Sequence, residues 1–308
     1  MINQKYVYGP VPSRRMGLSL GISPIPKKTC NYSCVYCQLG RTDKMTNQRQ
    51  MFFPVEDILS ELEESLKNTP KLDVITLVGE GEPTLYLGLH DLIQGIKKLT
   101  DKPIAVITNG ALFYDDEVVK ALNLSDIVLP TFDAIDEELF STINRPHGSL
   151  DFHKINEGLK KFSHEYQGEL WLEMMFLEEI NNSQDQLEKY KKELEEISYN
   201  RLYLNTPVRP PAEAYIKPVS SEFMAYACDF LGGISIDLLS SVGFFSHIKD
   251  DYQAVLSIIK RHPMHQFEIE GFLKTRNCTN PSTIIERLAR DSGVIPIDYK
   301  GYITYRLR

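Results

Sequence analysis

The segment LSLGISPIPKKTCNYSCVYCQLG (residues 18–40) joins a short apolar run to a loop that carries three cysteines, Cys30, Cys34 and Cys37. The run LSLGI is typical of a short buried strand, and the prolines after it indicate that the chain then leaves regular structure. The sequence has five cysteines, and an odd total fits a framework of paired disulfides poorly. Three thiols this close together therefore indicate a metal or redox site.

The composition is that of an ordinary globular protein. The 308 residues are 42% hydrophobic and 25% charged, which is enough for one large domain and one small one. The N-terminus lacks the apolar stretch of a signal peptide, and no apolar run is long enough to span a membrane. We therefore expect a cytoplasmic protein without a membrane partner, in a compartment where clustered cysteines bind metals or exchange electrons.

The charge is unevenly distributed along the chain. The net charge of −8 argues against a protein that coats nucleic acid with a general basic surface. Residues 255–308, however, contain nine Lys or Arg against five Asp or Glu, so the C-terminal part is basic.

Apolar runs and amphipathic stretches alternate after residue 18, which predicts parallel strands joined by helical crossovers. The expected strands are residues 18–22, 73–78, 103–108, 126–132, 170–177 and 201–206, and the expected helices are residues 54–68, 89–99, 115–122, 149–162 and 183–197. Six such strands predict an α/β fold, a partial (β/α)6 TIM-like barrel whose functional residues gather at the carboxyl ends of the strands. The cysteines, GEGEPT (79–84), TNG (108–110) and FDA (132–134) each follow one of the first four strands.

The sequence changes character after the Pro-rich segment VRPPAEAYIKP (208–218). We expect the barrel with its N-terminal extension in residues 1–215 and a small C-terminal α+β module in residues 216–308. The pattern of helices followed by a hairpin around residues 300–301 resembles a winged-helix module, and a short cap packed on the barrel would give the same pattern. The C-terminal module is therefore predicted to be either a winged helix or a short cap on the barrel.

Thiolate ligands suit either zinc or an iron–sulfur cluster. A structural zinc site needs a fourth protein ligand, and the sequence offers none near the three cysteines. A four-iron cluster with three cysteine ligands leaves one iron open to a chelating cofactor or substrate. Cys228 lies in an amphipathic stretch and is expected in the core, and Cys278 is expected to be exposed.

The spacing Cys30-x3-Cys34-x2-Cys37, with Tyr36 before the third cysteine, resembles the cluster motif of radical S-adenosylmethionine enzymes. The resemblance implies that a [4Fe–4S] cluster binds the three thiolates and that S-adenosylmethionine chelates the fourth iron. It also implies reductive cleavage of that cofactor to a 5′-deoxyadenosyl radical, which abstracts hydrogen from a substrate. The electron would come from a donor such as a flavodoxin or ferredoxin.

Further positions resemble the cofactor-binding elements of that superfamily. The segment VGEGEPTL resembles its "GGE" element, although Glu80 stands where the usual pattern has glycine. A carboxylate there is a sensible partner for the ammonium group of the cofactor, because such a hydrogen bond is charge-assisted. The resemblance implies cofactor contacts from residues at the strand ends: Tyr36, Glu80, Gly81, Glu82, Pro83, Thr108, Asn109, Asp133, Glu173 and Asn205. Without the resemblance, GEGEPT could equally be a simple turn, and Asp133 could equally be a helix cap, with no role in binding a cofactor.

A closer resemblance extends over YGPVPSRRMGLSLG, INRPH and NTPVRPP, which are similar to a bacterial and archaeal subgroup named wyosine-type iron–sulfur oxidoreductases. Arg14, Arg15, Arg145 and Arg209 are candidate contacts for an anionic substrate because guanidinium forms bidentate hydrogen bonds, although surface ion pairs would explain each one as well. The substrate is a small molecule, a peptide or tRNA. No residue is indicated as the one that handles the substrate radical. The alternative function is a regulator that binds DNA through the C-terminal module and senses oxygen or iron with its cluster.

Overall fold

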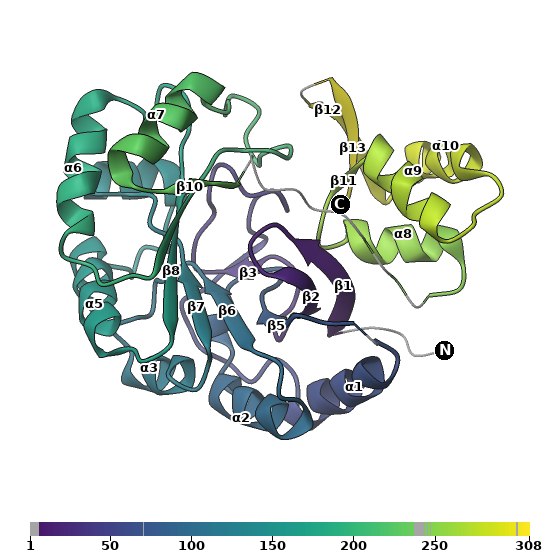
Figure 1. The fold of residues 1–308 in the computed structure, drawn as a ribbon, viewed down its shortest axis with the longest axis horizontal. Helices are drawn as coiled ribbons and strands as arrows, with labels where there is room; N and C mark the ends of the chain where they lie inside the picture. Colours follow the sequence, from purple (N-terminus) through teal and green to yellow (C-terminus); the bar gives the residue numbers. More distant parts are fainter. Residues whose placement is uncertain (1–5, 70, 237–243, 245, 247, 300) are drawn as a thin grey trace.

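The computed structural model describes residues 6–69, 71–236, 244, 246, 248–299 and 301–308. An eight-stranded sheet in the order β1-β2-β5-β6-β7-β8-β9-β10 curves through the larger part of the molecule (Figure 1). Its strands are β1 (Val7–Ser13), β2 (Gly17–Ile22), β5 (Val74–Leu77), β6 (Ile104–Thr108), β7 (Ile127–Pro130), β8 (Glu169–Met175), β9 (Arg201–Asn205) and β10 (Ile234–Ser235). The pair β1–β2 is antiparallel, and the other neighbours are parallel. The predicted partial barrel is confirmed.

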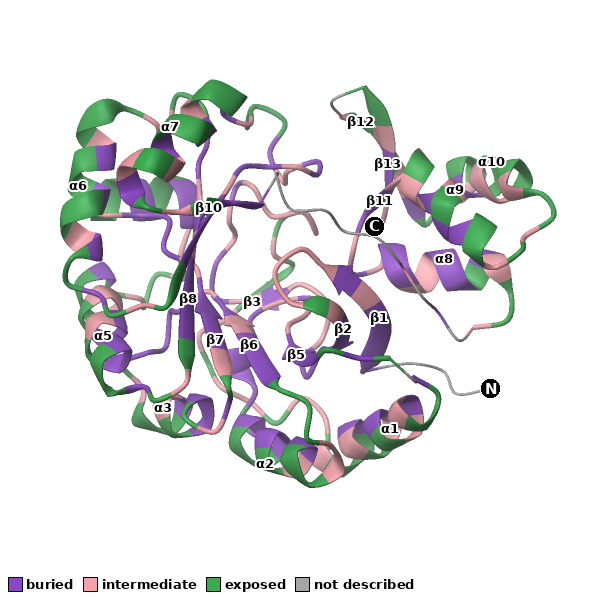
Figure 2. Ribbon diagram, viewed as in Figure 1, coloured by how far each residue is buried: buried purple, intermediate pink, exposed green. Residues whose placement is uncertain are grey.

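Amphipathic helices form the outer layer of the barrel. They are α1 (Val55–Lys67), α2 (Leu89–Leu99), α3 (Asp116–Leu122), α5 (Phe152–Glu165) and α6 (Gln184–Leu194). In α1, Ile58 and Leu62 are one turn apart and fully buried, because residues at this spacing share one face of a helix. The helices are accordingly buried toward the sheet and exposed on their outer sides, as Figure 2 shows.

The main core lies between the sheet and these helices. Strand residues such as Ile75, Leu77 and Val106 are completely buried there, as expected for parallel strands covered by helices. The apolar runs at the centre of the sheet fix the strands, so the loops at their carboxyl ends come together at one rim.

The helix α7 (Ser221–Leu231) and strand β10 lie with the barrel. Met224, Ala227 and Leu231 of α7 are part of the barrel core, and β10 pairs with β9. The apolar face of α7 packs against α6 and β9, whereas the expected division places α7 in the second unit.

The C-terminal module contains its own hydrophobic core. It comprises α8 (Asp251–Ile259), β11 (Met264–His265), α9 (Gln266–Thr275), α10 (Pro281–Arg290), β12 (Val294–Tyr299) and β13 (Tyr302–Leu307). The three strands form an antiparallel sheet in the order β11-β13-β12. Val255, Leu273 and Tyr305 are buried in its core, which is separate from that of the barrel. The module lies beside β1 and β2, across from α5 and α6 (Figure 1).

The module contacts the barrel through polar side chains. The guanidinium of Arg209, just after β9, hydrogen-bonds both carboxylate oxygens of Glu268 at 3.0 Å and also donates to the carbonyl of Pro263. The Tyr299 hydroxyl donates to the carbonyl of Pro207 at 2.7 Å. These contacts connect the sixth parallel strand directly to α9 and the β12–β13 hairpin.

Sequence patterning missed β1, β10, β11 and α9. The strand β1 carries two prolines and a bulge, so its alternation is interrupted. The helix α9 was not predicted because its apolar residues are spread around its circumference. No helix among the described residues is long and apolar enough to cross a membrane.

Candidate active site

The cysteine loop (residues 30–40) crosses the rim of the barrel after β2. The amide of Val35 donates to the carbonyl of Ile143 at 2.9 Å, and the amide of Glu213 donates to the carbonyl of Val35 at 3.0 Å. At its start, β3 (Thr29–Cys30) pairs with β4 (Lys44–Met45). The loop is therefore held by segments that follow the fourth and sixth parallel strands.

The three thiols of the loop are half-buried and lie within electrostatic reach of one another. Burial raises the pKa of each thiol, and Asp133 and the other two cysteines raise the pKa of Cys34 further. In the part of the chain that the structure describes, no three His, Cys, Asp or Glu side chains converge on a single metal ion. A four-iron cluster does not require convergence on one ion, because each cysteine ligates a different iron. Three clustered soft thiols thus fit the donor set of such a cluster.

Two amide side chains point toward these sulfurs. The Nδ2 of Asn109 lies 3.7 Å from Sγ of Cys30, and the Nδ2 of Asn144 lies 3.6 Å from Sγ of Cys34. Both amides have an additional partner that fixes their orientation, since Asn109 donates to Asn31 and Asn144 donates to Asp133. Amide N–H donors therefore face two of the three sulfurs.

The Glu82 carboxylate joins the ends of β5 and β6. Its Oε1 accepts from the hydroxyls of Thr84 and Thr108, both at 2.6 Å, and its Oε2 accepts from the amide of Asn109 at 2.7 Å. Burial raises the pKa of Glu82, and these hydrogen bonds oppose the rise. The carboxylate thus fixes the TNG turn beside the cysteine loop, and Pro83 begins the short 3₁₀ helix η1 (Pro83–Leu85) behind it.

Gly81 and Glu80 face different surroundings from Glu82. A Cβ atom at Gly81 would lie 1.9 Å from the carbonyl oxygen of Thr29, so the close approach of this turn to the cysteine loop requires glycine. The buried Glu80 carboxylate instead lies 3.3 Å from Arg261 and 3.8 Å from Lys260. The Glu80 side chain therefore contacts the C-terminal module in this structure.

Asp133 connects the fourth strand to the cysteine loop. Its Oδ2 accepts from the Tyr36 hydroxyl and from Nδ2 of Asn144, and its Oδ1 accepts from the amide of Met175 at 2.9 Å. Burial raises the pKa of Asp133 to about 6, even though these hydrogen bonds favour the charged form. Asn144 ends the π-helical turn η2 (Phe140–Asn144), a type of distortion that often occurs at functional sites.

A cleft of about 370 Å³ opens between the barrel rim and the C-terminal module. Cys37 and Tyr36 form part of its wall, together with Glu173 and Asn205 from β8 and β9. Glu173 forms an ion pair with Arg15 and accepts a hydrogen bond from Asn205 at 3.1 Å. The predicted rim residues of the fifth and sixth strands thus lie in one cavity with a cysteine of the loop.

The four candidate arginines divide into two groups. Arg14, Arg15 and Arg209 line the cleft, together with Arg261, which the sequence did not suggest. Arg145 lies apart from the cleft lining, where its guanidinium contacts Glu213 at 2.5 Å and Tyr215 at 3.0 Å. Its φ of 47° is left-handed, so the backbone turns sharply at the end of η2.

The family model of the radical SAM superfamily matches residues 25–190, which is more than half of the chain. The chain belongs to the radical SAM superfamily. A UPF0026 protein of Methanocaldococcus jannaschii is 38% identical over 97% of this chain and 94% of its own length.

Radical SAM enzymes are also found among solved structures of similar fold. A radical SAM methyltransferase from Sphaerobacter thermophilus has a TM-score of 0.53 at 15% identity, covering 71% of this chain and 67% of its own. TYW1 with a bound lysine–pyruvate adduct has a TM-score of 0.54 at 15% identity, covering 70% and 74%. At such identities the likeness concerns the fold, and it agrees with the radical SAM barrel. The family match over residues 25–190 makes this chain a radical SAM enzyme.

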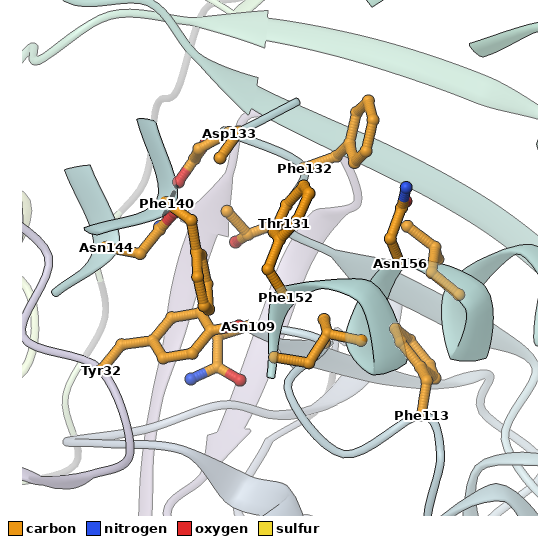
Figure 3. Close-up of a pocket in the computed structure, with 14 residues that line it drawn as sticks. Tyr32, Asn109, Phe113, Thr131, Phe132, Asp133, Phe140, Asn144, Phe152 and Asn156 are labelled. Carbon is orange, nitrogen blue, oxygen red and sulfur yellow. Dashed lines mark hydrogen bonds between the residues drawn. The ribbon is translucent and has the colours of Figure 1, made fainter. Parts of the chain in front are cut away.

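A small cavity of about 40 Å³ lies behind Asp133, between the strand ends and α5 (Figure 3). Tyr32, Phe140 and Phe152 supply its aromatic walls, and Asn156 from α5 faces it. The Oδ1 of Asn156 is buried without a hydrogen-bond partner in the structure. The cavity is large enough for a water molecule and too small for a cofactor.

Sequence reasoning missed Asn144, Glu213, Arg261 and His262 as site residues. Asn144 lies in INRPH, a segment in which only the resemblance, and no periodicity, marked a function. Arg261 and His262 line the cleft but belong to the C-terminal module, so no pattern in the barrel sequence could have placed them there.

Proposed function

We propose that this radical SAM enzyme holds a [4Fe–4S] cluster through Cys30, Cys34 and Cys37 and uses it to cleave S-adenosylmethionine reductively. The observation that carries the proposal is the clustering of three thiols on one loop, of which Cys37 forms part of the cleft wall. When bound, the cluster and its cofactor supply the hard chemistry, a 5′-deoxyadenosyl radical that abstracts hydrogen from the substrate. The chain itself orients the cofactor and excludes water.

The proposed cofactor contacts remain those expected from the resemblance: Tyr36, Glu80, Gly81, Glu82, Pro83, Thr108, Asn109, Asp133, Glu173 and Asn205. Glu82 supports this assignment through its buried carboxylate, which fixes Thr108 and Asn109 at the rim. Glu173 and Asn205 support it from the cleft wall, where an ammonium or a ribose hydroxyl would find a carboxylate and an amide. For Glu80 the main-chain atoms are better placed than the side chain, which contacts Arg261.

The substrate of the cleft is proposed to carry an anionic group. Arg14, Arg15, Arg209 and Arg261 line the cavity, whereas Glu173 is the acidic side chain in its described lining. Guanidinium recognises carboxylate and phosphate through paired hydrogen bonds, which suits a carboxylated metabolite, a peptide or a tRNA backbone. Arg145 is a weaker candidate because it does not line the cleft.

The C-terminal module is proposed to be a winged helix. Its element order α8-β11-α9-α10-β12-β13 and its sheet order β11-β13-β12 support this assignment. Its helix α10 presents Arg287 and Arg290 but also Glu286, so a role in base readout is not favoured.

The proposal is tested with anaerobically reconstituted protein. The wild type should show a broad absorbance near 400 nm and, with a strong reductant, should convert S-adenosylmethionine to 5′-deoxyadenosine. Cys34→Ala should lose both, whereas Cys228→Ala, which changes a cysteine packed against the barrel core, should keep both. A wild type that binds neither iron nor cofactor would overturn the proposed function.

A further inference from the structure

Five cations gather where the C-terminal module meets the cysteine loop. This basic patch consists of Lys27, Lys28, Lys260, Arg306 and Arg308. The Nζ of Lys27 donates to the main-chain oxygen of Arg308. A Cβ atom at Gly40 would lie 3.6 Å from Nζ of Lys28 and 3.8 Å from Nη2 of Arg306, so these two cations meet above the end of the loop.

The basic patch lies directly against the third cysteine of the loop. The Nη1 of Arg306 donates to the carbonyl of Gln38 at 3.2 Å, one residue after Cys37. The guanidinium of Arg306 therefore lies beside the third cysteine of the loop.

The basic patch is poorly neutralised in a chain whose net charge is −8. Among the described side chains, Asp43 and Glu80 are the carboxylates within ion-pair distance of its lysines, at 3.6 Å from Lys28 and 3.8 Å from Lys260, while Lys27 contacts the main-chain oxygen of Arg308. The Asp43 side chain is 70% exposed, so its attraction to Lys28 is weakened by solvent. Burial lowers the pKa of Lys27, and the charges of Lys28 and Lys260 lower it further, as expected where like charges crowd together.

We propose that the basic patch is the docking site of a small acidic electron-carrier protein that reduces the cluster. This inference rests on the proposed function. The carrier is oxidised by one electron and the cluster is reduced by one, so no further reactant is needed. Complementary charge increases the rate of encounter and aligns the partners, which is what a brief electron-transfer complex requires.

The location of the basic patch favours the binding of an electron carrier there over the binding of a substrate. The patch borders the outer end of the cysteine loop, whereas Arg14 and Arg15 lie on the β1–β2 connection inside the cleft. A carrier at the patch would approach Cys37 from outside without entering the cleft. Because Arg306, Arg308 and Lys260 come from the C-terminal module, this module supplies more than half of the docking surface.

The test uses reconstituted holoenzyme, with reduced flavodoxin as the carrier and dithionite as a small reductant. The variant is Lys27→Glu with Arg308→Glu, a half-buried and an exposed position of the patch. The matched control is Lys161→Glu with Lys192→Glu, which makes the same charge change on exposed positions of α5 and α6. Cluster bleaching near 400 nm is followed by stopped flow, and calorimetry measures the Kd for oxidised flavodoxin, at low and high salt.

We expect flavodoxin to reduce the variant at least about tenfold more slowly and to bind it about tenfold more weakly at low salt. High salt should remove the difference, and dithionite should reduce wild type, variant and control equally. Equal rates and Kd values with flavodoxin would overturn the proposal. So would an equal slowing with dithionite, which would assign the cations to tuning of the cluster, or a loss confined to tRNA binding. Absence of the 400 nm absorbance in the wild type would instead contradict the proposed function.

Discussion

Nδ2 of Asn144 lies 3.6 Å from Sγ of Cys34 while the same amide donates to Asp133 at 2.9 Å. The residue occupies the end of a π-helical turn, which aims its side chain inward at the cysteine loop. A hydrogen bond to a ligating sulfur stabilises the more negative, reduced state of a cluster and so raises its reduction potential.

Asn144→Ala is therefore expected to lower the midpoint potential of the reconstituted cluster. Loss of about 1 kcal/mol of hydrogen bonding corresponds to about 40 mV for one electron. The measurement is a redox titration followed by electron paramagnetic resonance. Asn156→Ala is the control, because Asn156 donates to Glu193 instead of to a sulfur. Identical potentials for the wild type and Asn144→Ala would show that the amide does not tune the cluster.

Gly81→Ala is expected to impair cluster assembly more than folding. The added Cβ would lie 1.9 Å from the Thr29 carbonyl, so the start of the cysteine loop must shift. Overpacking of this kind destabilises proteins by about 1–3 kcal/mol. Iron and sulfide content per chain should fall, while the circular dichroism spectrum stays that of the wild type. Gly148→Ala is the control, since its Cβ would meet nothing within 4 Å, and equal iron content in both variants would refute the prediction.

Glu213 is expected to make stability pH-dependent in the acid range. Its hydrogen bonds from Arg41, and then those from Arg145, lower its pKa to about 2. A carboxyl group whose pKa is lower in the folded state stabilises the protein above its unfolded pKa, and that contribution is lost as pH falls from about 4.5 toward 2.

Glu213→Gln should therefore reduce the free energy of unfolding at pH 7 by about 1 kcal/mol, a value reduced for solvent because Arg41 is 70% exposed. The difference from wild type should disappear near pH 2, as measured by urea unfolding across this range. Glu196→Gln, at a carboxylate that is 54% exposed and pairs with Lys160, should have a smaller effect at pH 7. A pH-independent difference for Glu213→Gln would rule out this electrostatic account.

The sequence predicted the barrel well because the strands at the centre of the sheet form apolar runs. The run at residues 103–108, for example, becomes β6 almost residue for residue, since a strand covered on both faces needs no alternation. The same reasoning placed Glu82, Thr108 and Asp133 at one rim, because parallel strands end at the same edge.

The sequence could not predict contacts that join distant segments. Glu80 follows a barrel strand like its neighbour Glu82, yet its carboxylate turns to Arg261, and no local signal distinguishes the two glutamates. Arg209 was expected to contact substrate and lines the cleft, but its ion pair with Glu268 had no signal in the sequence. Such partners depend on how the C-terminal module sits on the barrel, which periodicity does not encode.

The Arg209–Glu268 pair is expected to hold the C-terminal module in place. Burial alone would raise the pKa of Glu268, but the charge and hydrogen bonds of Arg209 outweigh it and leave the pKa at about 2. Arg209→Met leaves this carboxylate without its main partner. Breaking a buried pair at one side is destabilising by about 3–5 kcal/mol.

The double variant Arg209→Met with Glu268→Gln should recover much of that loss, because no uncompensated charge is then buried. Hydrogen exchange measures where in the chain this stability is lost. Amides of α9 should exchange faster in Arg209→Met than in the double variant, while those of α2, in the outer layer of the barrel, should be unchanged. If α2 and α9 lose protection equally, the pair stabilises the whole chain and the module is not held by it. If neither changes, the contact contributes little to docking, and Arg209 is free to serve the substrate as the sequence first suggested.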